Sequence, residues 1–186
     1  MFASEINRTL VALKSQKTIL YPTDTVWGIG CDATDFDAVA KIYNIKQRVE
    51  SKSLIILVAS LEMLQNYIEE IPKKAIEILR KSTKPTTIIY KNPKGLAKNC
   101  IAEDNTIAIR IVQNEFCQEL IRQFGKPIVS TSANISGIPT PKSFSEIGST
   151  ILDSVDYIVN LQQEKIASAA SRILKISDEK VEVIRE

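Results

Sequence analysis

Histidine is absent from this sequence of 186 residues, and that absence excludes several kinds of chemistry. Without an imidazole there can be no Ser-His-Asp triad, no histidine proton shuttle and no histidine-ligated metal site. Cysteine is also scarce, with three residues far apart and no C-x-x-C pair to hold zinc or exchange disulfides. We expect Cys31, Cys100 and Cys117 to be buried thiols in a reducing compartment.

Long apolar runs are missing too. No segment supplies about 18 uninterrupted apolar residues for a membrane span, and the amino-terminal segment lacks a basic start followed by an apolar stretch. These features predict a cytoplasmic protein with no membrane partner. The 24 Lys and Arg residues nearly balance the 22 Asp and Glu residues, so no overall field indicates a nucleic acid as partner. Any basic site must be local.

The remaining composition, 44% hydrophobic and 25% charged, is that of an ordinary globular domain. Short apolar runs predict strands at 18–21, 54–58, 86–90, 106–112, 128–130 and 157–159, and a hairpin around 177–180. Helical periodicity predicts a helix at the amino terminus, one after Asp35, and others near 61–69, 73–82, 114–124 and 145–153. No linker or repeat divides the chain. We therefore predict one α/β domain over 1–186, an open, twisted, mixed β-sheet with flanking helices.

A basic segment lies between the helix predicted after Asp35 and the apolar run 54–58. It carries three cations within seven residues, Lys46, Arg48 and Lys52. One interpretation is structural, because Lys and Arg in a last helical turn satisfy carbonyls and the helix dipole. The other rests on location, since loops that lead into a buried strand commonly line a cleft, where several cations can neutralise a polyphosphate.

Small polar residues crowd the end of the strand predicted at 128–130. The residues concerned are Ser130, Ser132 and Asn134, with Thr140 shortly after them. Their side chains, together with exposed backbone N–H groups, form the kind of nest that receives phosphate or carboxylate oxygens. A plain turn explains the composition equally well, because Ser, Thr and Asn also hydrogen-bond their own backbone.

Two further segments combine strands with polar side chains. Asp24 and Thr25 follow the first strand and could hold an amine and a hydroxyl, although Asp24 could equally cap a turn while Trp27 fills the core. Arg110 ends the alternating run 106–110 of the strand predicted at 106–112. It either points to solvent or offers its planar fork to a carboxylate.

Two apparent nucleotide motifs do not meet their structural requirements. Residues 28–33 read G-x-G-x-x-A, but Pro22 and a polar segment interrupt the apolar strand that a dinucleotide fingerprint needs. Gly125-Lys126 is followed by proline and lacks the glycine of a Walker loop. A nucleotide would be held here without either motif.

Four blocks of this sequence, PTDTVWGIG, KQR with SLIILV, TIAIR and STSANISG, closely resemble the YrdC family of threonylcarbamoyl-AMP synthases in order and spacing. The resemblance covers nearly the whole chain. It implies an open α/β sheet around a basic cavity. It also implies nucleotidyl transfer, in which L-threonine, bicarbonate or carbon dioxide, and ATP form threonylcarbamoyl-AMP and pyrophosphate. That reaction leads to threonylcarbamoyladenosine (t6A) in tRNA, through downstream threonylcarbamoyl transferase proteins.

The resemblance also assigns residues to the site. It implies contacts to threonine from Thr25, Arg110 and Ser130, and contacts to ATP from Arg48, Lys52, Thr106, Ser132, Thr140 and Ser171. We add Asn134 from the same blocks as a nest-forming residue for ATP, and Lys46 and Arg48 as catalytic, phosphate-side residues. Three positions depart from the usual family pattern, namely Trp27, Ser53 and Arg172. Of these, Arg172 could place an extra cation beside the phosphates, or it could mean that the final strand contributes differently.

The implied reaction suits a protein without histidine. A carbamate anion must approach a nucleotide with about four negative charges, and each close pair of like charges costs ~1 kcal/mol in water and more in a drier cleft. Nearby cations offset this repulsion. Mg²⁺ is expected to bind with the nucleotide and not at a site of protein carboxylates. The carbamate oxygen is already anionic, so no strong general base is needed.

A different class of function fits the same features. Family members have also been described as binding double-stranded RNA or tRNA, so the alternative is an RNA-binding module without synthase activity. Lysines gather between Lys81 and Lys98, a stretch free of acidic residues. Such a stretch can contact RNA, although a solvated surface explains it as well.

Overall fold

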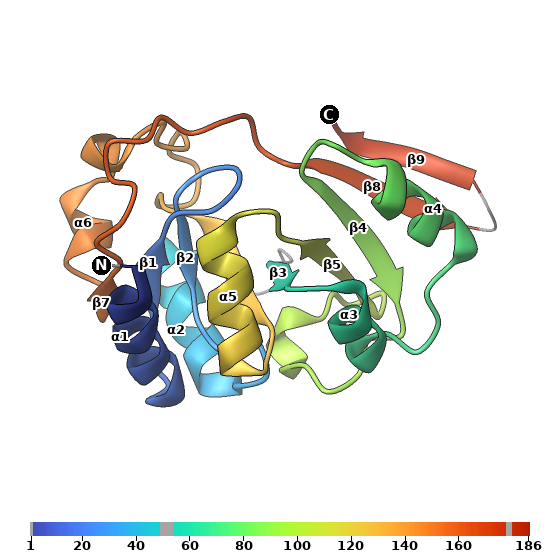
Figure 1. Ribbon diagram of the computed structural model, residues 1–186, viewed down its shortest axis with the longest axis horizontal. Coiled ribbons are helices and arrows are strands. Elements are labelled where there is room, and N and C mark those ends of the chain that lie inside the picture. The colour runs from blue at the N-terminus through green and yellow to red at the C-terminus, as the bar shows by residue number, and fades with distance from the viewer. Residues whose placement is uncertain (1, 49–53, 178–179) are drawn as a thin grey trace.

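The computed structural model describes residues 2–48, 54–177 and 180–186. Within these ranges the strands form one mixed sheet in the order β7-β1-β2-β6-β3-β5-β4-β8-β9 (Figure 1). The strands are β1 (Ile19–Tyr21), β2 (Gly28–Gly30), β3 (Ile55–Val58), β4 (Thr86–Lys91), β5 (Thr106–Ile111), β6 (Ile128–Ser132), β7 (Tyr157–Ile158), β8 (Arg172–Ser177) and β9 (Lys180–Arg185). Pairing is parallel for β1–β7, β3–β5 and β4–β8 and antiparallel for the other neighbours. The predicted open, mixed sheet is confirmed.

Helices flank this sheet, as predicted. They are α1 (Phe2–Lys14), α2 (Phe36–Lys46), α3 (Leu61–Tyr67), α4 (Lys73–Lys81), α5 (Glu115–Phe124) and α6 (Ser149–Leu152). The helix expected over 145–153 is shorter, because a turn of 3₁₀ helix at Phe144–Glu146 precedes α6. None of the described helices is long and apolar enough to cross a membrane.

The ends of α2 show how its sequence sets its length. Asp35 caps the amino terminus by accepting a hydrogen bond of 2.9 Å from the backbone N–H of Ala38. At the other end Gln47 takes a left-handed conformation with φ 49°, and its N–H bonds to the carbonyl of Asn44. The helix therefore stops at Lys46, and the chain carries Arg48 away from it.

Sequence reasoning missed β2, which holds two glycines in three residues. A Cβ atom on Gly30 would lie 2.4 Å from the carbonyl oxygen of Val129 and 2.6 Å from a ring carbon of Tyr21. Only glycine lets the strands pack this closely. The G-x-G pattern thus serves sheet packing, and β-propensity alone could not reveal it.

Two apolar clusters cover the two faces of the sheet. One includes Ile42 of α2 with Ile107 and Ile109 of β5, and the other includes Leu13 of α1 and Phe116 of α5. In Figure 1, α1 and α5 lie together in front of the β1–β2 part of the sheet. The three cysteines are buried within these clusters, as predicted. Burial raises the pKa of Cys100 to about 12, which keeps this thiol protonated and unreactive.

Candidate active site

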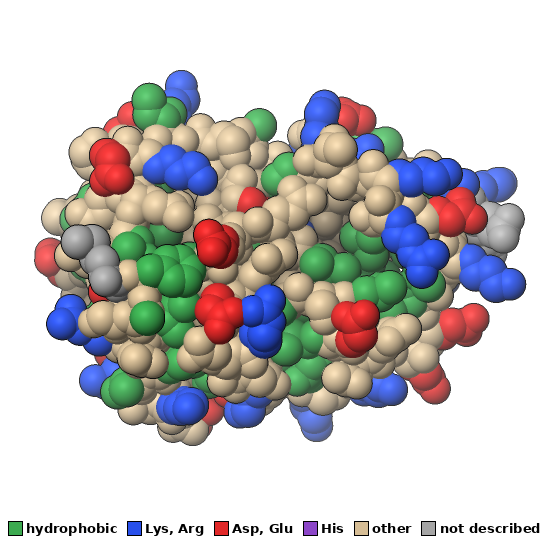
Figure 2. Space-filling view, viewed as in Figure 1, with side chains coloured by type: hydrophobic (Ala, Val, Ile, Leu, Met, Phe, Trp, Pro, Cys, Tyr) green, Lys and Arg blue, Asp and Glu red, His purple; other side chains and the backbone are tan. Residues whose placement is uncertain are grey.

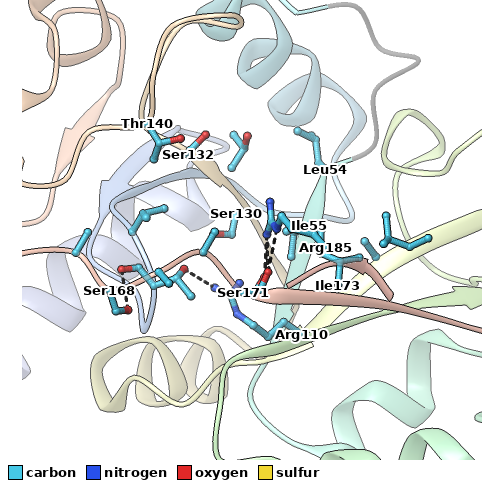
Figure 3. A pocket seen from close by; sticks show the side chains of 18 of the residues that line it. Leu54, Ile55, Arg110, Ser130, Ser132, Thr140, Ser168, Ser171, Ile173 and Arg185 are labelled. Atoms are coloured by element: carbon cyan, nitrogen blue, oxygen red, sulfur yellow. Dashed lines mark hydrogen bonds between the residues drawn. The ribbon is translucent and has the colours of Figure 1, made fainter. Parts of the chain in front are cut away.

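A cavity of about 590 Å³ lies on the sheet face that also carries α1 and α5. Alternation along β5 explains its position: Ile107 and Ile109 point into the core on one face, so Ala108 and Arg110 point to the other face and line the cavity. Its lining comes from widely separated segments (Figure 3), namely Thr25, Val26, Arg48, Leu54, Ile55, Ile89, Ala108, Arg110, Ser130, Thr131, Ser132, Thr140, Pro141, Lys142, Ala167, Ser168, Ala169, Ala170, Ser171, Ile173, Ile184 and Arg185.

Most residues that the sequence assigned to the site meet in this one cavity. The structure brings together Thr25, Arg48, Arg110, Ser130, Ser132, Thr140 and Ser171. Figure 3 shows Arg110, Ser171 and Arg185 on one side of it and Ser132 and Thr140 on another. Lys52 and Ser53 lie outside the described residues.

Arg110 forms the floor of the cavity and is held there by a buried ion pair. Nη2 of Arg110 donates to Oδ1 of Asp24 at 3.0 Å and to Oγ1 of Thr25 at 3.3 Å. The side chains of Arg110 and Asp24 are only 3% and 7% exposed. The alternative in which Arg110 simply points to solvent is therefore wrong. Nε of Arg110 has no hydrogen-bond partner among the described residues, and this leaves a donor for an anion.

Lys46 lies behind the loop that follows β6, not among the residues that line the cavity. Its Nζ donates to the carbonyl oxygens of Ser132 and Asn134, the latter at 2.7 Å, and its own carbonyl accepts from the N–H of Ser136 at 2.9 Å. Burial, followed by the charge of Arg48, lowers the pKa of Lys46 to about 8. These contacts fix the polar nest in place, and a catalytic role for Lys46 stays a prediction.

Two residues assigned to ATP also lie outside the cavity lining. Thr106 is on the same face of β5 as Arg110, but its hydroxyl donates to Oδ1 of Asp104 at 2.6 Å. The amide of Asn134 turns back to its own loop and donates to the carbonyl oxygens of Ile135 and Ile138. Thr106 and Asn134 are therefore bonded to protein groups in this structure.

Sequence reasoning missed several polar residues that line the cavity, among them Lys142, Ser168 and Arg185. Arg185 reaches in from the edge strand β9, and its Nε and Nη2 donate to the carbonyl of Ser171 at 3.0 and 2.8 Å. Burial, followed by the charge of Arg110, lowers the pKa of Arg185 from its ordinary value. No motif marks these residues. The one available signal was the predicted hairpin, which returns the chain beside Ser171.

Two departures from the family pattern are explained by their contacts. Trp27 is buried and packs against the ring of Phe144 at a centroid distance of 4.9 Å, so it fills the core. Arg172 alternates with Ser171 and Ile173 and lies outside the lining. It contacts the hydroxyls of Ser82 and Thr86 at 3.3 and 3.2 Å. Of the two interpretations of Arg172, the structure therefore does not support an extra cation in the cavity lining, which leaves a final strand that contributes differently.

The cavity has the electrostatics of an anion site. Arg48, Arg110, Lys142 and Arg185 contribute four cations to its lining, and no Asp or Glu residue lines it within the part of the chain that the structure describes. Burial also lowers the pKa of the Arg48 guanidinium, which shows that its charge is partly desolvated. The same described residues contain no cluster of three or more His, Cys, Asp or Glu that could hold a metal ion.

Comparisons with known proteins agree on the same relatives. A Sua5/YciO/YrdC family model, described as "Telomere recombination", matches residues 11–186. Proteins named threonylcarbamoyl-AMP synthase from Photobacterium profundum and Psychromonas ingrahamii are 34% and 35% identical, over 76% and 77% of this chain and 78% and 77% of theirs.

Solved structures show the same fold. Sua5 from P. abyssi complexed with L-threonine aligns with a TM-score of 0.86 and 26% identity, over 97% of this chain, which spans only 53% of the Sua5 chain. The E. coli YciO structure aligns with a TM-score of 0.82 and 24% identity, over 97% of this chain and 88% of its own. With a family model covering nearly the whole sequence, the chain belongs to the Sua5/YciO/YrdC family.

Proposed function

We propose that this chain is a threonylcarbamoyl-AMP synthase, a nucleotidyltransferase that makes threonylcarbamoyl-AMP and pyrophosphate from L-threonine, bicarbonate or carbon dioxide, and ATP. Relatives that carry this name at 34–35% identity support the proposal. One observation carries it: a buried arginine suited to a carboxylate, Arg110, lines the same cavity as the cations Arg48 and Arg185. A single hollow thus offers places for an amino acid and for a polyphosphate.

The amino acid is assigned to the floor of the cavity. Arg110 faces its carboxylate with the donors that Asp24 leaves available. The hydroxyls of Thr25 and Ser130 lie in the same lining and supply hydrogen bonds for the remaining polar groups. L-Threonine in the P. abyssi Sua5 structure supports this substrate class.

ATP is assigned to the rest of the lining. Arg48 and Arg185 supply charge for the phosphates, and Ser132, Thr140 and Ser171 supply hydroxyl groups. Lys52 and Thr106 are included by resemblance, and Asn134 as a nest-forming residue of the same blocks. Lys46 stabilises the polar nest after β6 by bonding its backbone carbonyls from outside the cavity lining. Mg²⁺ is expected to bind with the nucleotide phosphates, where it adds further positive charge.

The chemistry then needs positioning and charge stabilisation more than proton transfer. The carbamate of threonine attacks the α-phosphorus of ATP through its oxygen, a new P–O bond forms, and the bond to pyrophosphate breaks. Arg48 and Arg185 reduce the repulsion between the two anions and stabilise the charge that moves onto the leaving group. No histidine is required.

The product defines further partners. Threonylcarbamoyl-AMP is a mixed anhydride that must be transferred to an adenosine of tRNA, so we assign downstream threonylcarbamoyl transferase proteins as partners and the cytoplasm as the location. A direct tRNA or double-stranded RNA contact is the competing function. Lys and Arg side chains gather over the end of the molecule that carries α4, β8 and β9 (Figure 2).

Pyrophosphate release separates the two functions. A synthase must release pyrophosphate only when L-threonine, bicarbonate and ATP are all present, and Arg48→Ala must reduce this release at subsaturating ATP. An exposed cation outside the cavity, Lys180, gives the matched control Lys180→Ala. Absence of release, together with RNA affinity that falls by roughly 0.7–0.9 log units per log unit of salt for each phosphate contacted, would favour the RNA-binding module.

A further inference from the structure

We propose that Asp24 is a positioning residue, which holds the Arg110 guanidinium so that its remaining donors face the carboxylate of the amino-acid substrate. This inference rests on the proposed function, because it concerns how the floor of the same cavity recognises threonine. Asp24 lies outside the cavity lining, and the resemblance assigns it no role. Asp24 takes this positioning role through its bonds to other protein groups and not through contact with the substrate.

The carboxylate of Asp24 is itself firmly held. Oδ1 accepts from Nη2 of Arg110 at 3.0 Å, while Oδ2 accepts from the backbone N–H of Gln113 at 3.1 Å. On the backbone side, the hydroxyl of Ser168 donates to the carbonyl oxygen of Asp24 at 2.8 Å. Asp24 therefore ties the loop after β1 to the end of β5 and to the segment before β8.

This anchoring decides which donors of the guanidinium are available. Nη2 is used by Asp24 and Thr25, whereas Nε has no partner among the described residues. The two bidentate forks of a guanidinium, Nε with Nη2 and Nη1 with Nη2, both include Nη2, so Asp24 and Thr25 hold the nitrogen that sets the orientation of the plane. With Nη2 held, the guanidinium is fixed at the cavity lining, and its other donors are left for a carboxylate.

Asp24 also balances charge. The guanidiniums of Arg110 and Arg185 are close enough for the first to lower the pKa of the second. A buried cation without a partner carries a large desolvation cost, so an Arg110 lacking Asp24 would move toward water or toward other acceptors. The ion pair keeps Arg110 in the cavity before any substrate arrives, and this reduces the reorganisation needed for binding.

The test compares a ligand that has the carboxylate with one that lacks it. Binding of L-threonine and of L-threonine amide is measured by isothermal titration calorimetry on the wild-type chain and on Asp24→Asn, a variant of nearly the same shape. We expect Asp24→Asn to weaken L-threonine binding about 10- to 100-fold and to change L-threonine amide binding less than about twofold. A merely structural role would weaken both ligands alike.

Controls keep the outcomes distinct. Asp153→Asn, at an exposed position outside the cavity, is expected to bind both ligands as the wild type does. If Asp24→Asn does not fold, Asp24→Glu keeps the charge but displaces the guanidinium, and it is expected to lose affinity for L-threonine selectively, by a smaller factor. Equal loss for both ligands, or no loss in a folded variant, overturns the positioning role. A wild-type chain that binds neither ligand contradicts the proposed function itself.

Discussion

The cavity has two walls of different construction. The inner wall consists of Thr25, Val26, Arg110 and residues 130–132, and most of its side chains are buried. The outer wall consists of residues 167–171, Ile184 and Arg185, and apart from Ser171 and the half-buried Ala167 these residues are exposed. Figure 1 shows the segment before β8 crossing from the β7 edge of the sheet to the β8 end.

Sheet topology explains this difference. The strands β5 and β6 have a paired neighbour on both sides, whereas β9 pairs only with β8 and forms an edge. The segment before β8 is held to the inner wall by few bonds, among them those from Ser168 to the carbonyls of Asp24 and Thr25. The inner wall is thus pre-organised for a small, specific ligand, and the outer wall supplies charge and a boundary.

The largest effect is expected from a substitution at Lys46, which supports the inner wall from outside the cavity lining. Lys46→Met removes the ammonium that bonds the carbonyls of Ser132 and Asn134 and leaves both acceptors without it. We expect a loss of about 1–3 kcal/mol in the free energy of unfolding at pH 7.5, measured with urea. Pyrophosphate release is expected to fall at least tenfold, since the nest after β6 loses its support.

The effect of pH sharpens this prediction. Because the pKa of Lys46 is about 8 when folded and near its ordinary 10.5 when unfolded, the unfolded chain binds more protons between these values. This lysine therefore makes the wild type more stable as the pH rises from about 8 to 10.5. The free energy of unfolding of the wild type minus that of Lys46→Met must therefore increase between pH 7.5 and 9.5. A constant or falling difference contradicts the lowered pKa of Lys46.

An intermediate effect is expected at the outer wall. Arg185→Ala removes a cation that reaches the cavity from β9, while Lys180→Ala removes one from the same strand outside the cavity. We expect Arg185→Ala to raise the KM for ATP about 5- to 10-fold and to change the KM for L-threonine less, because the inner wall is intact. Steady-state pyrophosphate release measures both constants. Equal increases in both, or equal effects of the two variants, would remove the distinction between the walls.

The two walls also differ in how well the sequence predicts them. Arg110 and Ser130 belong to short, contiguous strand motifs that carry the resemblance, and both residues line the cavity. Arg185 could not be placed this way, because a register irregularity between Ile173 and Leu174 decides which residue of β9 lies beside Ser171. Lys142 and Ser168 lie in segments without periodicity, where only tertiary contacts set the position.

Two of the predicted polar residues lie outside the cavity lining for a related reason. Thr106 and Asn134 have the right types at the right places in the sequence, yet their side chains are bonded to Asp104 and to the loop after β6. A motif gives the position of a side chain along the chain, while neighbouring acceptors decide where it points. The partner of Asp24, Arg110, is 86 positions away in the sequence, so their ion pair could not be predicted from the sequence.

The smallest effect is expected at the junction of the two walls. Ser168→Ala removes the hydroxyl bonds to the carbonyls of Asp24 and Thr25 but keeps the backbone N–H that bonds the carbonyl of Thr25 at 3.1 Å. We expect kcat/KM for L-threonine to fall no more than about threefold. Ser168→Pro removes that N–H as well and is expected to have a clearly larger effect. If the two variants behave alike, the backbone bond does not hold the walls together, and the segment before β8 is positioned by the sheet alone.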